Sequence, residues 1–140
     1  MNYKKRGQIG LEYLIVVAFV VFVVIAMLAA AIFYTSEARD KIKINQLSNF
    51  ANKVINSAES VYFAGEPSKV TVTAFLPEGI ESFQVLENSL VFNITTDSGV
   101  TRIAYPSSVP LDAAINLSVA SGVKRLQIIA GSDKVYVNQI

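Results

Sequence analysis

The stretch YLIVVAFVVFVVIAMLAAAIFY, residues 13–34, decides the architecture of this chain. It contains no charged residue, and Val, Ile, Ala, Phe and Leu make up most of it. A helix rises about 1.5 Å per residue, so a segment of this length spans roughly the 30 Å of a bilayer's hydrocarbon layer. Tyr13 and Tyr34 bracket it, as interfacial aromatic residues tend to do. The stretch therefore predicts a helix that is inserted in a membrane at some stage of the protein's life.

The helix is expected to continue well beyond the apolar stretch. Between Gly10 and Gly65 the chain has no glycine, and its first proline is Pro67, so the two strongest helix breakers are missing from this interval. One helix is thus predicted from near Gln8 to about Phe63. Beyond Thr35 the apolar residues recur at spacings near three and four, which predicts a face that packs against another part of the chain. These residues are Ala38, Ile42, Leu47, Phe50, Ala51, Val54, Ala58, Val61 and Tyr62.

From Lys69 onward the apolar period changes to two, which is the period of a β-strand. The predicted strands fall within residues 70–74, 83–85, 90–95, 100–105, 113–120, 124–130 and 134–137. Turn-forming residues separate them, as at Pro77-Glu78-Gly79 and Gly131-Ser132-Asp133. Short strands with tight turns indicate an antiparallel meander or a small sandwich. The predicted fold class is α+β, with a long N-terminal hydrophobic helix followed by a small antiparallel β head.

The composition excludes several classes of function. The 140-residue chain has no cysteine and no histidine, which excludes Ser-His-Asp and Cys-His catalysis and leaves only oxygen ligands for a metal. Its formal net charge of +1 is too small to suggest nucleic acid as the main partner. The acids of the β region fall at predicted turns, where carboxylates are usually solvated; they are Glu78, Glu87, Asp97 and Asp133. We therefore expect no enzyme activity, no catalytic residue, no cofactor and no metal.

The residues before the apolar stretch are open to three interpretations. A secretory signal peptide would be cut after Ala31, but the apolar run is long for such a signal and the cut gives no role to Glu12. An uncut signal anchor would make the chain a membrane-anchored extracellular binding module that does not polymerise. The charges do not fix the orientation of such an anchor, because Arg39, Lys41 and Lys43 match the cations at positions 4–6.

The third interpretation follows from KKRGQIGLE, residues 4–12, which resembles the class III signal peptide of archaeal type IV pilins. In that family a prepilin peptidase cuts between a small residue and a glutamine, on the cytoplasmic side of the apolar segment. A glutamate is the fifth residue of the mature chain. The resemblance places the cut between Gly7 and Gln8, with Glu12 as that glutamate and with Lys4, Lys5 and Arg6 as the cations of the leader. Gly10 stands where serine is common in the family, and Val16 where leucine is common.

The resemblance implies a leader at residues 1–7, a helix at 8–65 that is first membrane-spanning and then amphipathic, and a β-rich head at 66–140. It implies a structural subunit that is membrane-inserted as a precursor and then forms a homopolymer, a filament on the cell surface that serves adhesion. A pilus assembly ATPase and a membrane platform are the further partners it implies.

Assembly would bring Glu12 of one subunit to the amino terminus of its neighbour, a pair that fixes the register between them. The hypothesised helix contacts are Val16, Phe19, Val20, Val23, Ala26, Met27 and Ala30. The alternatives are that these side chains face only lipid and that Glu12 only benefits from the macrodipole at a helix start.

Two triplets match the acceptor pattern for N-glycosylation, Asn93-Ile94-Thr95 and Asn116-Leu117-Ser118. They favour an external location of the head. Sugars are common on the outside of filaments in the resembled family, so Asn93 and Asn116 are candidate glycosylation sites. Unmodified asparagines in a strand or a turn are the alternative.

Overall fold

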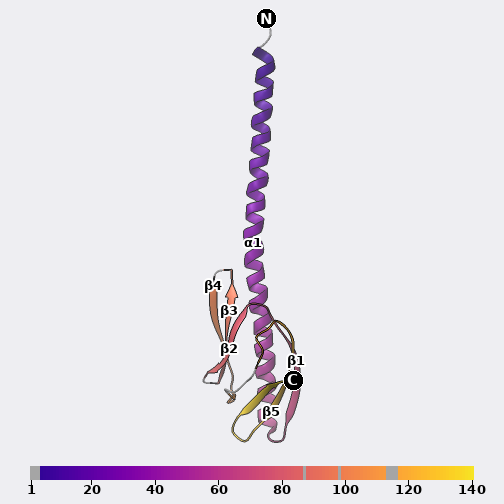
Figure 1. Ribbon diagram of the computed structural model, residues 1–140, viewed down its shortest axis with the longest axis vertical. Coiled ribbons are helices and arrows are strands. Elements are labelled where there is room, and N and C mark those ends of the chain that lie inside the picture. The colour runs from indigo at the N-terminus through magenta and orange to yellow at the C-terminus, as the bar shows by residue number, and fades with distance from the viewer. Residues whose placement is uncertain (1–3, 87, 98, 113–116) are drawn as a thin grey trace. The chain divides into compact units, whose positions relative to one another are not determined.

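The computed structural model describes residues 4–86, 88–97, 99–112 and 117–140, and for residues 4–9 it describes the backbone alone. Helix α1 runs without a break over 61 residues, Lys4–Ala64 (Figure 1). It ends at Gly65, whose φ of 74° is left-handed and whose N–H donates to the carbonyl oxygens of Val61 and Tyr62 at 3.2 and 3.1 Å. Glycine adopts this backbone without the steric cost that other residues carry. The predicted end of the helix is confirmed.

The start of α1 lies four residues before the predicted one, at Lys4 instead of Gln8. Neither Gly7 nor Gly10 interrupts the helix, because a glycine inside a helix costs only about 1 kcal/mol relative to alanine. The chain divides into two compact units between Arg39 and Asp40. Residues 40–64 of α1 therefore belong to the same unit as the strands.

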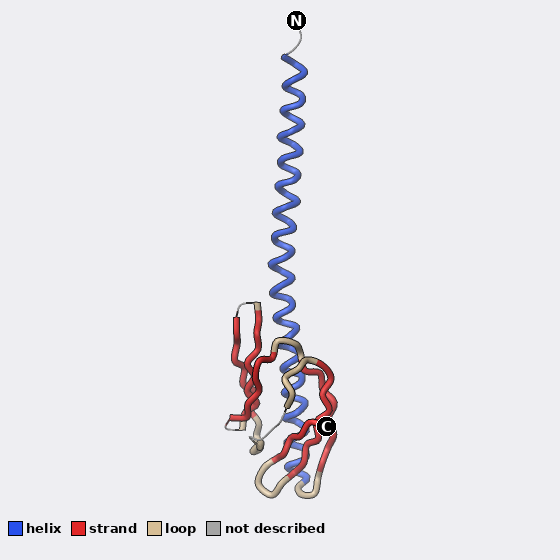
Figure 2. The backbone as a smooth tube through the Cα atoms, in the orientation of Figure 1, coloured by secondary structure: helices blue, strands red, loops and turns tan. Residues whose placement is uncertain are grey.

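Six strands are described, and every strand pair is antiparallel (Figure 2). They form two three-stranded sheets, with the orders β1-β5-β6 and β2-β3-β4. The second sheet is a simple meander, whereas β1 pairs with a strand far along the chain. The bounds are β1 Lys69–Leu76, β2 Ile80–Leu86, β3 Ser89–Thr96, β4 Gly99–Pro106, β5 Gly122–Ala130 and β6 Val135–Gln139. The predicted α+β class, a long apolar helix followed by a small antiparallel head, is confirmed.

The core of the second unit lies between α1 and the strands. Residues predicted on the inner face of the helix are buried there, namely Leu47, Phe50, Ala51, Val54, Ala58 and Val61. The ring of Phe50 meets that of Phe92 on β3 edge to face, at 6.2 Å between centroids. Of the other three residues predicted for this face, Tyr62 is half-buried against the core, Ala38 is exposed and Ile42 is 55% exposed. The buried face therefore begins at Leu47, about two and a half turns later than Ala38, where the apolar spacing placed its start.

Left-handed backbone positions occur in two of the connections, the crossover from β1 to β2, which belong to different sheets, and the hairpin between β2 and β3. Gly79, between β1 and β2, has a φ of 87°, and a Cβ there would lie 3.0 Å from the carbonyl oxygen of Thr95. Asn88, between β2 and β3, has a φ of 65°, a conformation that asparagine tolerates better than most residues.

The strand predicted at 113–120 is not present in its described part. Residues 113–116 lie outside the described residues, and residues 117–120 form no strand. Leu117 is partly buried against the core, whereas Val119 and Ala120 are exposed, so the apolar side chains of the segment do not share one buried face. The backbone N–H of Ser118 instead donates to Oε1 of Gln139, at 2.9 Å.

Candidate functional site

Residues 10–34 of α1 carry their large apolar side chains on the surface. The exposed fraction is 63% for Leu11, 67% for Phe19 and 78% for Phe33, and nothing in the most apolar 18-residue window is buried. A large apolar side chain left in water forgoes about 1.5–3 kcal/mol of burial free energy. The helix is long and apolar enough to span a bilayer, which is an environment that removes this cost.

The seven residues hypothesised as assembly contacts lie together on this segment. Six of them are exposed and Val23 is half-buried; the six are Val16, Phe19, Val20, Ala26, Met27 and Ala30. At about 100° per residue, all seven fall on one side of the helix within roughly 120°. Leu14, Ile25 and Ile32 cover the opposite side and are exposed as well. A helix that is apolar all round suits lipid or the interior of a helix bundle.

Glu12 lies eight residues after Lys4, the first residue of α1, and its side chain is exposed. The effect of the helix macrodipole falls off within the first turn, and the first turn of α1 contains no acidic residue. The macrodipole therefore gives Glu12 little stabilisation in the uncut chain. The other predicted recognition residues are helical in their backbone, while their side chains lie outside the described part; they are Lys4, Lys5, Arg6, Gly7 and Gln8.

The candidate glycosylation site Asn93 lies in the middle of β3, the central strand of its sheet. Its side chain is half-buried, and its Nδ2 donates a hydrogen bond of 2.8 Å to Oγ of Ser82 on β2. The nitrogen to which a sugar would be attached is thus engaged in the folded head. Asn116 lies outside the described residues.

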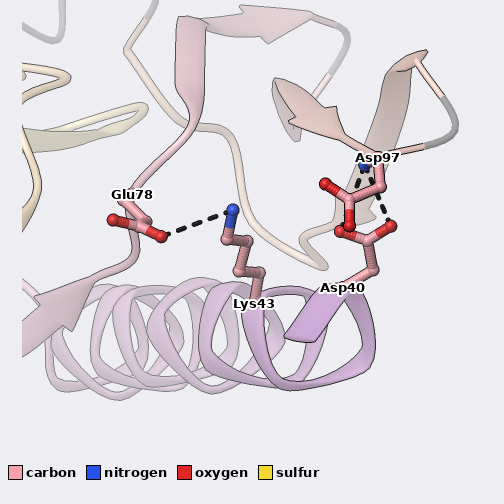
Figure 3. A network of polar contacts seen from close by, with 4 residues as sticks. All are labelled: Asp40, Lys43, Glu78 and Asp97. Carbon is pink, nitrogen blue, oxygen red and sulfur yellow. Dashed lines mark hydrogen bonds and ion pairs between the residues drawn. The ribbon is translucent and has the colours of Figure 1, made fainter. Parts of the chain in front are cut away.

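Polar contacts fasten residues 40–53 of α1 to the β strands and turns. The carboxylate of Asp40 accepts the backbone N–H of Asp97 with both oxygens, at 3.0 and 3.3 Å (Figure 3). Nζ of Lys43 lies 3.4 Å from Oε1 of Glu78. Sequence reasoning missed both contacts, because each joins residues far apart in the chain, 57 positions for Asp40 and Asp97, and no local pattern indicates such a pair.

A further ion pair joins Lys134 to Asp112, with 2.9 Å between Nζ and Oδ2. Asp112 is buried, and its hydrogen bond and negative charge raise the pKa of Lys134. Of the acids expected at turns, Asp133 is exposed and Glu87 lies outside the described residues. Among the residues that the structure describes, no three His, Cys, Asp or Glu side chains are grouped so that they could hold a metal ion.

Comparison of the chain with protein family models, with curated proteins and with solved structures found no match.

Proposed function

We propose that this chain is a prepilin, the precursor of a structural subunit that polymerises through its N-terminal helix into an archaeal type IV-like surface filament. The observation that carries the proposal is the exposed apolar segment at residues 10–34 of α1. A helix of this kind is compatible with lipid or with a bundle of its own kind, but not with water. The helix would lie in lipid while the chain is a precursor, and in a bundle of identical helices once the chain is part of a filament.

The cleavage motif supports the same proposal. A prepilin peptidase acting between Gly7 and Gln8 removes the cations of the leader and creates a positive α-amino group at Gln8. Glu12 is then the nearest acid to that terminus in the chain. When two helices pack side by side with an axial stagger, Glu12 of one subunit meets the new amino terminus of the other. Breaking such a desolvated pair by removing one partner costs about 3–5 kcal/mol, so the pair selects one register.

The proposed life cycle requires partners at each stage. The peptidase processes the precursor in the membrane, and an assembly ATPase with a membrane platform extracts the helix and adds it to the filament. The β head, which has its own core, would then coat the outside and make the adhesive contacts.

Replacing Glu12 tests the proposal. In Glu12→Ala we expect normal processing but loss of filaments from the cell surface, as seen by electron microscopy, because the amino terminus of the neighbour is left without its partner. The matched control is Glu37→Ala, which removes an exposed acid from the same helix, beyond the apolar segment. Filaments that assemble equally well in both variants would contradict the register role of Glu12.

A membrane-anchored binding module that does not polymerise is the second candidate. It is favoured by a shallow groove in the second unit, lined by residues of α1 and β1. Polar and aromatic groups meet in this groove, as in small-ligand sites; they are Gln46, Asn49, Phe50, Lys53, Thr73 and Phe75. For such a module, cells would carry the chain at the surface with no filament in either of the variants above.

A further inference from the structure

The outward face of α1 in the second unit carries a row of asparagines that the proposed filament function does not use, although one of them, Asn49, also lines the groove described above. Asn45, Asn49, Asn52 and Asn56 follow one another at spacings of four, three and four residues, and all four are exposed. We refer to these four residues as the amide stripe. At about 100° per residue the stripe lies within roughly 60° on one side of the helix.

The composition of the amide stripe is unusual for a helix face in water. Such faces usually carry charged residues, and asparagine is a poorer helix former than Lys, Glu or Gln. Between Lys43 and Glu59, however, the only charged residue is Lys53, and its Nζ donates to the carbonyl oxygen of Thr73 at 2.7 Å. None of the four asparagines belongs to an Asn-x-Ser/Thr triplet, so glycosylation does not account for them.

The amide groups of the stripe are also largely unused within the chain. Within the described residues, the side chains of Asn45, Asn49 and Asn56 make no hydrogen bond, and Asn52 makes one to Oγ of Ser48 at 3.3 Å. Each amide offers both donors and an acceptor, so one stripe can pair with an identical stripe. A surface with a fixed charge could not pair with itself in this way.

We propose that the amide stripe is a contact surface for the amide stripe of a second copy of this chain, packed side by side and in parallel. The inference rests on the proposed function, because copies inserted in one membrane with one orientation run parallel. Alternating spacings of three and four residues are those of a seam between packed parallel helices, and a buried asparagine in such a seam fixes the register. Asparagine side chains also form hydrogen bonds between neighbouring helices.

The spacing of the stripe agrees with the register that Glu12 would select. Pairing Glu12 with the amino terminus at Gln8 shifts one copy by four residues, about 6 Å, relative to the next. The same shift sets Asn49 beside Asn45 of the second copy, and Asn56 beside Asn52. The stripe would thus repeat, in the head, the register set at the start of the helix.

Disulfide crosslinking of full-length chains in native membranes tests the inference, and the chain has no cysteine of its own to interfere. Two single-cysteine versions, Asn45→Cys and Asn49→Cys, are expressed together and oxidised. A second pair, Val16→Cys with Val20→Cys, has the same four-residue offset and reports on the apolar segment. Ser132→Cys, at an exposed turn of the head, is the control for random collision. We expect both pairs to give a dimer band on non-reducing gels that the control lacks.

The other outcomes are distinguishable. Crosslinking of the Val16 and Val20 pair alone would overturn the amide contact and leave the proposed polymer intact. Crosslinking of neither pair above the control would overturn the proposed function and this inference together. As a second measurement, Asn49→Lys is expected to lose filaments that Asn49→Gln retains, because only the lysine places a fixed charge in the seam. Equal filament yields in these two variants would contradict the inference.

Discussion

At the scale of single residues, the head delays the deprotonation of Tyr105 and Lys134. Burial raises the pKa of Tyr105, and a hydrogen bond with Ser48 partly offsets that rise. The hydrogen bond to Asp112, reinforced by its negative charge, raises the pKa of Lys134. Both groups therefore lose their protons at a higher pH in the folded chain than their ordinary values of 10.0 and 10.5.

These shifts predict a loss of stability at alkaline pH. Because both pKa values are raised in the folded state, the stabilisation is complete below about pH 10 and falls as the pH rises through the raised values. The midpoint of thermal unfolding, followed by circular dichroism of the full-length chain in detergent, should therefore decrease across that range. The double variant Tyr105→Phe, Lys134→Met should decrease less steeply. Parallel curves for the two proteins would show that these groups do not contribute.

Both carboxylate oxygens of Asp40 on α1 accept the backbone N–H of Asp97 in a turn of the head. Asp40→Ala leaves the backbone N–H of Asp97 without its acceptor. We expect the free energy of unfolding to fall by about 1 kcal/mol, less than is usual for a bond to a charged group, because the site is partly exposed. Urea unfolding of the full-length chain in detergent measures this change. Asp133→Ala, at an exposed turn, is the control and should leave the free energy nearly unchanged. Equal losses in both variants would contradict a role for the contact.

At the scale of helices and strands, the spacing of apolar residues predicted where the helix and the strands lie, but not which strands pair with each other. The apolar spacings predicted most of the buried residues of α1, and the period of two predicted β1 to β6. The same period failed at residues 117–120, which form no strand although Leu117 packs against the core. Nothing local indicated that Lys69 of β1 pairs with Ile129 of β5, because a strand pattern describes which face is buried and not which edge is joined.

The core between α1 and the strands should depend strongly on Phe92. This residue is 0% exposed, and its ring meets the rings of Phe50, Phe83 and Tyr105. Phe92→Ala should lower the free energy of unfolding by about 3–5 kcal/mol, through lost burial and the cavity left behind. Phe75→Ala is the matched control, since Phe75 lies on β1 and is 48% exposed. Denaturant unfolding should separate the two variants by more than about 1 kcal/mol, and similar losses would argue against this packing.

At the scale of the whole molecule, the chain combines an exposed apolar helix segment, residues 10–34, with a second unit that has its own hydrophobic core. The segment could be predicted because its length, its lack of charge and the position of Glu12 are all local features of the sequence. The contact of Asp40 with Asp97 could not, since it joins residues that only the folded head brings together. The amide stripe could not be recognised as a surface from the sequence either, because only the fold shows which face of α1 remains exposed.

Determining the first residue of the mature protein tests most directly the central claim that this chain is a prepilin. Intact mass and terminal peptide sequencing of the protein from native cells should identify Gln8, free or cyclised to pyroglutamate, as the first residue. This result would place the cut between Gly7 and Gln8 and leave Glu12 as the fifth residue. A chain that starts at Ile32 would mean ordinary signal removal, and an intact Met1 would mean a permanent anchor. Either of these results would contradict assembly into a filament through α1.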